Sequence, residues 1–218
     1  MEEPPFILIR PWQSPSQQEI RNRPLVIKTP SNAYRLPFFA DFFSRQRLRL
    51  LHLRREAAAS INGLYDGWRY PRGFHAFRSA EVQPGPCESA GPHPEPGWWK
   101  YDMPPGWQHW KQAPLTQICA FQWAEAHRWI FKEAELCDDQ FSLNFEDILN
   151  SSARKELDRL ISWLNIEADA PLSRGLLSDI PPVMATNRPR RKRYFARAAL
   201  LEPALRMAEV QEISKRIQ

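Results

Sequence analysis

Three basic side chains follow two apolar runs, at positions where an anion could bind. Lys28 comes directly after the run 25–27, and Arg54 and Arg55 come directly after the run 48–53. Both runs are typical of buried strands. Because parallel sheets bind ligands at the carboxyl ends of their strands, these side chains predict a site for an anionic molecule. The alternative is that the arginines are solvated surface charges.

A second basic cluster, near the C-terminus, contains Arg188, Arg190, Arg191, Lys192 and Arg193. From the residues alone it is either a solvated run of charge or a patch for nucleic acid. The helix expected after it lacks the exposed aromatic residues that stack on bases, which argues against single-strand binding.

A hydroxyl acceptor would need a general base, and the side chains that could accept its proton are Glu125, His127, His75 and His109. None is favoured by its spacing, and each is also explained as a helix-surface charge or a loop histidine. His52 is flanked by leucines in an expected strand, which favours a satisfied core residue. Glu146 and Asp147 follow another expected strand, where adjacent carboxylates typically cap a helix.

The elements that would position these groups indicate an α/β domain. Strands are expected at 25–27, 48–53 and 141–145, and helices over 36–43, 56–64, 115–136 and 151–164 and from Ala198 onwards, with a bend or restart at Pro203. Ser31 or Asn32 can cap the first helix, and Gly63 and Gly67 are expected to end the second. The first strand, the first helix and the second strand predict a right-handed parallel crossover.

The range 70–114 is a long insertion that is rich in proline and, after Gly97, in aromatic residues. The composition of 79–96 predicts a flexible tip, whereas the aromatic half predicts packing. The aromatic residues between Trp98 and Trp110 could form a lid that holds an acceptor with a sugar, phenol or apolar group. Alternatively, the same side chains pack the insertion onto the core.

The 218 residues and 43% apolar content fit a single domain, and the net charge of +5 suits an anionic small molecule as well as nucleic acid. No run approaches the ~20 apolar residues that cross a bilayer, and residues 1–5 lack the features of a secretion signal. We therefore expect a cytoplasmic protein without a membrane span. The spacing of Cys87, Cys119 and Cys137 favours thiols over disulfides, and no metal site is expected.

The chain contains, in order, Pro24-Leu-Val-Ile-Lys28-Thr-Pro30, then Leu50-Leu-His-Leu-Arg54-Arg55, then Ser60, then Phe145-Glu-Asp-Ile148 and a helix ending in Trp163-Leu-Asn-Ile166. This order, over most of the chain, resembles the sulfotransferase family that uses phosphoadenosine phosphosulfate (PAPS). The resemblance implies a P-loop-like fold, in which helices flank a parallel sheet in three layers.

The resemblance also implies roles for the basic residues. Arg54 or Arg55, with Ser60, would hold the 3′-phosphate of the nucleotide, and Lys28 would face the transferring group. The family's spacing points to Asn62, so Ser60 and Asn62 are both candidates. The family's late loop implies that the same phosphate is contacted by Arg190, Arg191, Lys192 and Arg193. These residue types fit sulfuryl transfer, which needs in-line alignment and stabilisation of spread negative charge.

The chain departs from this family in three places. Arg54-Arg55-Glu56 stands where the family usually has an arginine followed by a proline two residues on. No glycine occurs before Gly63, so the glycine-containing phosphosulfate loop has no counterpart, and we expect a domain truncated at its N-terminus. Pro30 stands where one branch of the family has a catalytic histidine, so a general base must come from elsewhere.

Three functions stay open at this point. The favoured one is a sulfotransferase that moves a sulfuryl group from PAPS to a hydroxyl or amine of a small-molecule or glycan acceptor. The second is a non-catalytic remnant or partner subunit that binds nucleotide, or binds protein through an unpaired sheet edge. The third and least favoured is a basic nucleic-acid-binding module.

Overall fold

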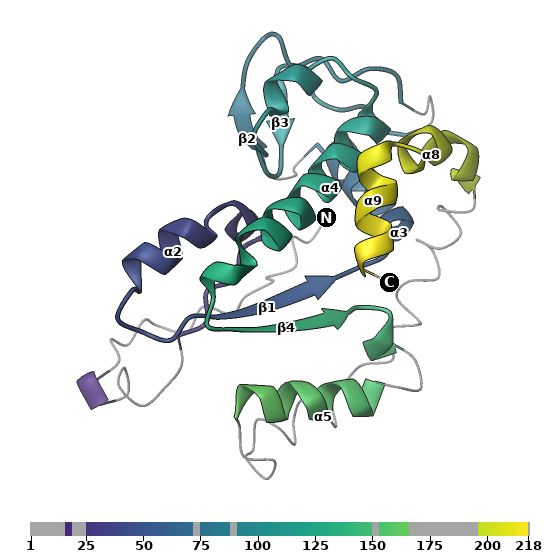
Figure 1. Cartoon of the computed structure of the whole chain (residues 1–218). Helices are drawn as coiled ribbons and strands as arrows, with labels where there is room; N and C mark the ends of the chain where they lie inside the picture. Colours follow the sequence, from purple (N-terminus) through teal and green to yellow (C-terminus); the bar gives the residue numbers. More distant parts are fainter. Residues whose placement is uncertain are drawn as a thin grey trace.

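Two parallel strands lie at the centre of the molecule (Figure 1). In the computed structural model, which describes residues 16–18, 25–71, 75–87, 91–149, 153–165 and 196–217, β1 (Arg49–Arg54) pairs with β4 (Asp139–Asn144) from Arg49↔Asp139 to Arg54↔Asn144. The helices α3 and α4 lie between these two strands in the sequence. The expected strands at 48–53 and 141–145 are therefore confirmed, and so is their place in a parallel sheet.

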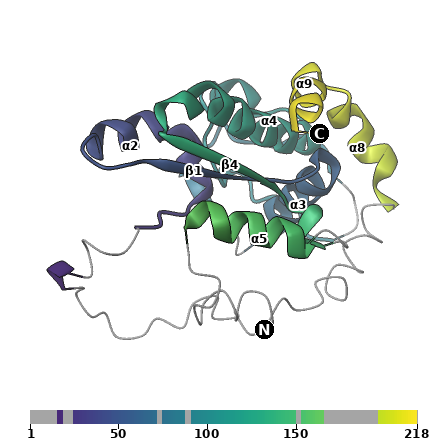
Figure 2. The same cartoon turned by 60° about the horizontal axis from the view of Figure 1, so that its bottom comes forward.

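The two faces of this sheet carry different side chains because residues alternate along a strand. His52 faces α4 (Leu115–Glu133), where its ring lies 5.4 Å from that of Phe131. Phe141 faces α5 (Ala153–Leu164), where its ring lies 5.3 Å from that of Trp163. Helices thus cover the sheet from both sides (Figures 1 and 2), and the fold is mixed α/β.

The apolar core is centred on α4 and on the helices packed against it. These are α3 (Ala57–Arg69), α8 (Ala198–Leu205) and α9 (Ala208–Ile217). Fully buried core side chains come from each, including Ile61, Ile118, Leu201 and Ile213. The expected long helix 115–136 is confirmed as α4 followed by the 3₁₀ turn η3 (Ala134–Leu136). The final helix begins at Ala198 as expected, continues through Pro203 to Leu205 and restarts at Ala208.

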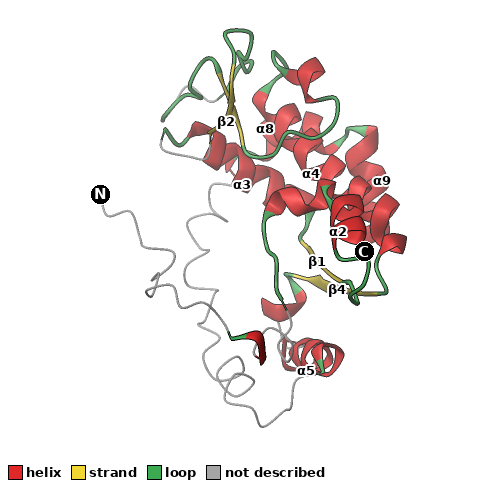
Figure 3. Cartoon of the chain, turned by 90° about the vertical axis from the view of Figure 1, so that its left-hand side faces the viewer, coloured by secondary structure: helices red, strands yellow, loops and turns green. Residues whose placement is uncertain are grey.

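The insertion 70–114 packs onto this core. Its strands β2 (His75–Arg78) and β3 (Trp98–Lys100) form an antiparallel pair, which Figure 3 shows at the end of α3 remote from β1 and β4, and η2 (Trp107–Trp110) follows. Val82 is fully buried, and the amides of Gln83 and Gly85 donate to the carbonyls of residues 111 and 113, each at 2.9 Å. Residues 82, 83 and 85 of the expected flexible tip are therefore anchored to the core, and for the rest of 79–96 the flexible tip stays a prediction.

A buried polar network joins the insertion to two core helices. The indole N–H of Trp68 on α3 donates to Gln122 Oε1 on α4 at 2.8 Å. The amide nitrogen of Gln122 in turn donates to the carbonyl oxygens of Lys100 and Asp102, both at 2.8 Å. Because buried polar groups are costly without partners, these hydrogen bonds fix the insertion in one position.

The segment before α2 (Leu36–Phe42) differs from the sequence-based prediction. Residues 25–27 form no strand, and Leu25 and Val26 are 73% and 79% exposed. The carbonyl of Ile27 instead accepts a hydrogen bond from the Asn32 side chain at 3.1 Å, in the 3₁₀ turn η1 (Pro30–Tyr34). The predicted crossover over 25–53 was therefore wrong. Ser31 and Asn32 lie within η1, and the helix α2 begins after Arg35, not after either of them.

Helix α3 also differs from the prediction, because it continues through Gly63 and Gly67 to Arg69. Gly67 lies directly against the Tyr101 hydroxyl, so a side chain at this position would overlap the tyrosine. The glycine is thus explained by a close contact between α3 and the insertion, where the sequence suggested a helix end.

We expect Gly67→Ala to lower the free energy of unfolding by about 1–3 kcal/mol, because the added methyl group must displace Tyr101. Gly63→Ala is the matched control, since among the described residues its would-be methyl group meets no atom within 4 Å apart from its chain neighbours and the backbone of its own helix. Alanine is favoured over glycine in a helix by up to about 1 kcal/mol, so this variant should be neutral or stabilised. Urea unfolding measures the free energy of unfolding of both variants. Equal values for Gly67→Ala and Gly63→Ala would contradict the close contact between Gly67 and Tyr101.

Candidate functional site

The carboxyl end of the parallel sheet is formed by two loops that hold each other in place. Arg54 ends β1, and only two residues separate it from Ala57, where α3 begins. The amide of Phe145, after β4, donates to the carbonyl of Arg54 at 2.8 Å. The Glu146 carboxylate accepts from the amide of Glu56 at 3.1 Å. The positions of the two arginines are therefore set by both strands.

Arg54 and Arg55 have hydrogen-bonding capacity that the described residues do not use. Their Nε atoms are buried and have no hydrogen-bond partner within the described part of the chain. The Arg55 guanidinium lies 5.0 Å from the Phe145 ring. Burial lowers the pKa of Arg54, and the nearby Asp147 partly opposes this effect. Half-buried guanidinium groups with unused donors are suited to an oxyanion such as phosphate.

The N-terminus of α3 lies beside these arginines. Its cap residue, Glu56, makes no side-chain capping hydrogen bond, and the first turn carries no acidic residue. The first backbone amides of a helix lack partners within it and favour negative charge. Ser60 is half-exposed in this part of α3. The arginine pair, the helix start and the serine hydroxyl thus come from one continuous segment.

Asn62, the other candidate donor, is in a different environment. It is only 4% exposed, and its side-chain oxygen accepts from Arg197 Nη1 at 3.2 Å. The same Arg197 nitrogen lies 2.5 Å from the Asp66 carboxylate. Asn62 therefore takes part in a buried contact between α3 and the residue before α8. Arg197 was missed at the sequence level because it lies just beyond the basic cluster at 188–193.

The other basic residues singled out in the sequence do not join this arrangement as expected. Lys28 is exposed in the extended segment before η1 and is not at the end of a strand. The second basic cluster lies outside the described residues, and with it the candidates Arg190, Arg191, Lys192 and Arg193.

The candidate general bases are mostly engaged elsewhere. His127 is buried on α4, and its Nδ1 lies 2.8 Å from Nε2 of the buried His52 on β1. Burial lowers the pKa of His52 to about 3, with His127 and Arg54 acting in the same direction. Burial likewise lowers the pKa of His127 to about 4, and Arg54 adds to this effect. The core role predicted for His52 is confirmed, and His127 shares it.

The remaining candidate bases lie in three separate places. Glu125 pairs with Arg128 on α4, and burial is the main cause that raises the pKa of its carboxyl group. His75 on β2 contacts Glu95, and His109 is exposed in η2. Of the two carboxylates after β4, Asp147 accepts locally from the Asn144 side chain at 2.9 Å, whereas Glu146 accepts from the distant amide of Glu56.

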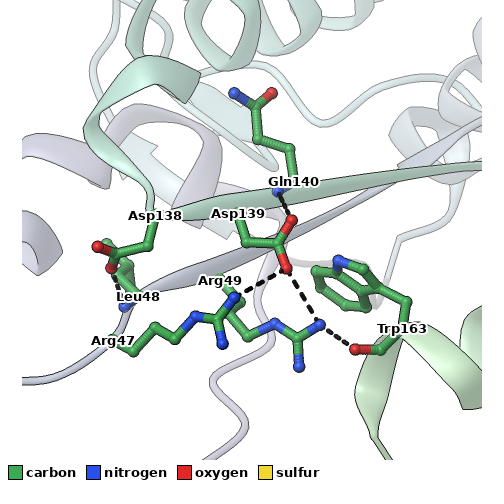
Figure 4. A network of polar contacts seen from close by, with 7 residues as sticks. All are labelled: Arg47, Leu48, Arg49, Asp138, Asp139, Gln140 and Trp163. Carbon is green, nitrogen blue, oxygen red and sulfur yellow. Dashed lines mark hydrogen bonds and ion pairs between the residues drawn. The ribbon is translucent and has the colours of Figure 1, made fainter.

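The opposite, amino end of the sheet is charge-compensated (Figure 4). The Asp139 carboxylate lies 3.2 Å from Arg49 Nη2 and 3.5 Å from Arg47 Nη2. The Arg49 guanidinium also stacks over the Trp163 ring at 3.9 Å and donates to the Trp163 carbonyl. Although Arg49 Nε has no hydrogen-bond partner among the described residues, the guanidinium charge of Arg49 is paired with the Asp139 carboxylate. The carboxyl end is therefore the better candidate for binding an anion.

The tryptophans of the expected lid are largely used in packing. Trp99 is fully buried and meets Trp68 edge to face, with ring centres 5.2 Å apart. Trp107 contacts Phe77 at 5.3 Å, and Trp110 stacks on Phe121 at 4.8 Å. These contacts favour the interpretation that the insertion covers the core, and acceptor binding here stays a prediction.

Neither a metal cluster nor a membrane span is found among the described residues. They contain no group of three or more His, Cys, Asp or Glu side chains that could hold a metal ion. No helix in the described ranges is long and apolar enough to cross a membrane.

The comparisons with known proteins give no relative. No family model, no curated protein and no solved structure matches this chain. The functional interpretation therefore depends on the residues at the carboxyl end of the sheet and on the order of the sequence motifs.

Proposed function

We propose that this chain is a PAPS-dependent sulfotransferase with a three-layer, P-loop-like fold. The observation that carries the proposal is the Arg54–Arg55 pair. It directly follows a parallel strand, directly precedes a helix N-terminus, and has two buried Nε atoms without partners. Such an arrangement suits the 3′-phosphate of the nucleotide, with Ser60 as an additional donor.

In the proposed reaction, the oxygen or nitrogen of the acceptor forms a bond to the sulfur of PAPS. The bond between sulfur and the bridging phosphate oxygen breaks, and adenosine 3′,5′-bisphosphate leaves. The protein has to hold these groups in line and stabilise the developing charge. Lys28 is our candidate for the transferring group, and Arg190, Arg191, Lys192 and Arg193 are further candidates for the 3′-phosphate.

A second candidate function is a non-catalytic domain that binds nucleotide or protein. Two observations favour it. Lys28 lies in an exposed segment that is not part of the sheet. Among the described residues, β1 pairs on one side only, and its Leu51 and Leu53 are 37% and 58% exposed. An open strand edge with apolar side chains is a template for another chain.

The nucleotide site is tested by thermal and urea unfolding with adenosine 3′,5′-bisphosphate. At 100 times its dissociation constant the ligand should add about 2.7 kcal/mol to the free energy of unfolding. Arg54→Ala or Arg55→Ala should abolish this gain, since each removes a phosphate donor. Arg154→Ala, which changes an exposed arginine on α5, should retain it.

The outcomes separate the two candidate functions. No stabilisation of the folded wild-type chain would contradict the nucleotide site. Stabilisation together with sulfated product from an acceptor panel supports the enzyme, and Lys28→Ala should then lose product formation while still binding the nucleotide. Stabilisation without product supports the non-catalytic domain. Steeply salt-dependent binding to DNA or RNA, without preference for the nucleotide, would indicate the nucleic-acid module instead.

A further inference from the structure

A thiol and an imidazole lie together on the surface of the insertion, far in sequence from the arginine pair. Cys87 Sγ is 3.1 Å from His93 Nδ1, within hydrogen-bonding distance for sulfur. Cys87 is half-buried, and His93 is exposed. A nucleophile and a base within hydrogen-bonding reach are the basic requirement for nucleophilic chemistry.

The fold holds both residues of this pair in place. Before Cys87, the amide of Gly85 donates to the carbonyl of Ala113 at 2.9 Å. Next to His93, the carbonyl of Pro92 accepts from Nε of the buried Arg69 at 2.8 Å. Cys87 itself packs against the apolar core. The approach of the Cys87 sulfur to the His93 nitrogen is therefore set by anchors on α3 and in the segment just before α4.

The other two cysteines are in unreactive surroundings. Cys119 is fully buried on α4, and burial raises the pKa of its thiol. Cys137 is 8% exposed, and burial with the nearby Asp138 raises the pKa of its thiol. The three cysteines form no disulfide with one another. The thiolate is the nucleophile and needs access to its target. Cys87 is half-buried, whereas Cys119 and Cys137 are buried, so Cys87 is the more accessible thiol.

We propose that Cys87 is a site of thiol–disulfide exchange in which His93 is the base. His93 Nδ1 takes the thiol proton, and the sulfur attacks one sulfur of a small-molecule disulfide. The S–S bond of that disulfide breaks, its second half leaves as a thiolate, and Cys87 remains as a mixed disulfide. The exposed position of His93 lets a low-molecular-weight disulfide reach the pair, whereas Cys119 and Cys137 are covered by the fold.

The test uses dithiobis(nitrobenzoate), an aromatic disulfide that releases a coloured thiolate. The folded chain should release one equivalent rapidly, and Cys87→Ser should remove this phase. His93→Gln, which keeps a polar side chain but cannot take the proton, should slow the phase by about tenfold or more. His109→Gln, a change of another exposed histidine of the insertion, should leave the rate unchanged.

Unfolding separates reactivity from folding defects. In denaturant all three cysteines should react, and wild type, His93→Gln and His109→Gln should react at the same rate. The proposal is overturned if the folded wild type shows no rapid equivalent, if that equivalent maps to Cys119 or Cys137, or if His93→Gln reacts at the wild-type rate. This test does not involve the nucleotide, so its result is independent of the proposed sulfotransferase function.

Discussion

Replacing Trp99 by alanine is expected to lower the free energy of unfolding by about 3–5 kcal/mol. Trp99 is fully buried, and its ring lies 5.2 Å from that of Trp68 and 5.0 Å from that of Trp107. Its indole N–H donates to the carbonyl of Asp102 at 2.8 Å. The change to alanine would open a cavity between α3 and the insertion and remove this hydrogen bond.

The neighbouring residue provides the control. Trp98 precedes Trp99 on β3, so its side chain points to the other face, where it is half-exposed and contacts His75 and Arg78. Trp98→Ala should therefore cost about 1 kcal/mol, as expected for a site outside the core. Denaturant unfolding of the two variants decides between a lid that moves and a covering of the core. Equal, small losses in the free energy of unfolding for the two variants would contradict the interpretation that the insertion covers the core.

The elements that the sequence predicted well are those with a regular apolar pattern. The spacing of Ile118, Phe121, Trp123 and Ile130 predicts one helix, and α4 with the turn η3 covers the expected residues. The strand near 50 was predicted from a short apolar run that ends at two arginines, and the strand near 142 from its alternation of apolar and polar side chains. Patterns of this kind depend only on residues that are close in sequence. The type and position of these helices and strands could therefore be predicted.

The errors arise where distant contacts decide the local structure. The apolar run 25–27 is too short for its pattern to separate a strand from an exposed extended segment. Gly67 was taken as a helix end because nothing in the sequence shows that Tyr101 packs against it. Nor does anything in the sequence show that the amides of residues 83 and 85, within the expected tip, donate to the carbonyls of residues 111 and 113.

The candidate site shows the same division. Arg54 and Arg55 could be placed at a strand end because the apolar run that precedes them predicts where β1 ends. The choice between Ser60 and Asn62 could not be made, because it depends on Arg197, which is 135 residues from Asn62. Likewise, no sequence signal brings His52 and His127 together, although they are in hydrogen-bonding contact across 75 residues.

Acid is expected to destabilise this protein through the His52–His127 pair. The folded-state pKa values of about 3 and about 4 lie below the ordinary value of 6.5. Below pH 6.5 the unfolded chain therefore binds protons that the folded chain does not. The stability that these two residues contribute is complete above pH 6.5 and is lost as the pH falls towards 3. Between pH 7 and pH 4 the loss should be on the order of 5 kcal/mol.

A double variant isolates this effect from other titrating groups. In His52→Gln/His127→Asn, amide groups replace the two ring nitrogens that face each other, so the hydrogen bond can form but neither residue titrates. Urea unfolding of both proteins from pH 7 to pH 4 should show a much steeper loss for the wild type. His109→Gln, which changes an exposed histidine, should follow the wild type. Parallel curves for the wild type and the double variant would mean that the pair is protonated in the folded state. The buried imidazoles beside Arg54 would then carry charge, and the electrostatic environment of the candidate anion site would differ from the one described above.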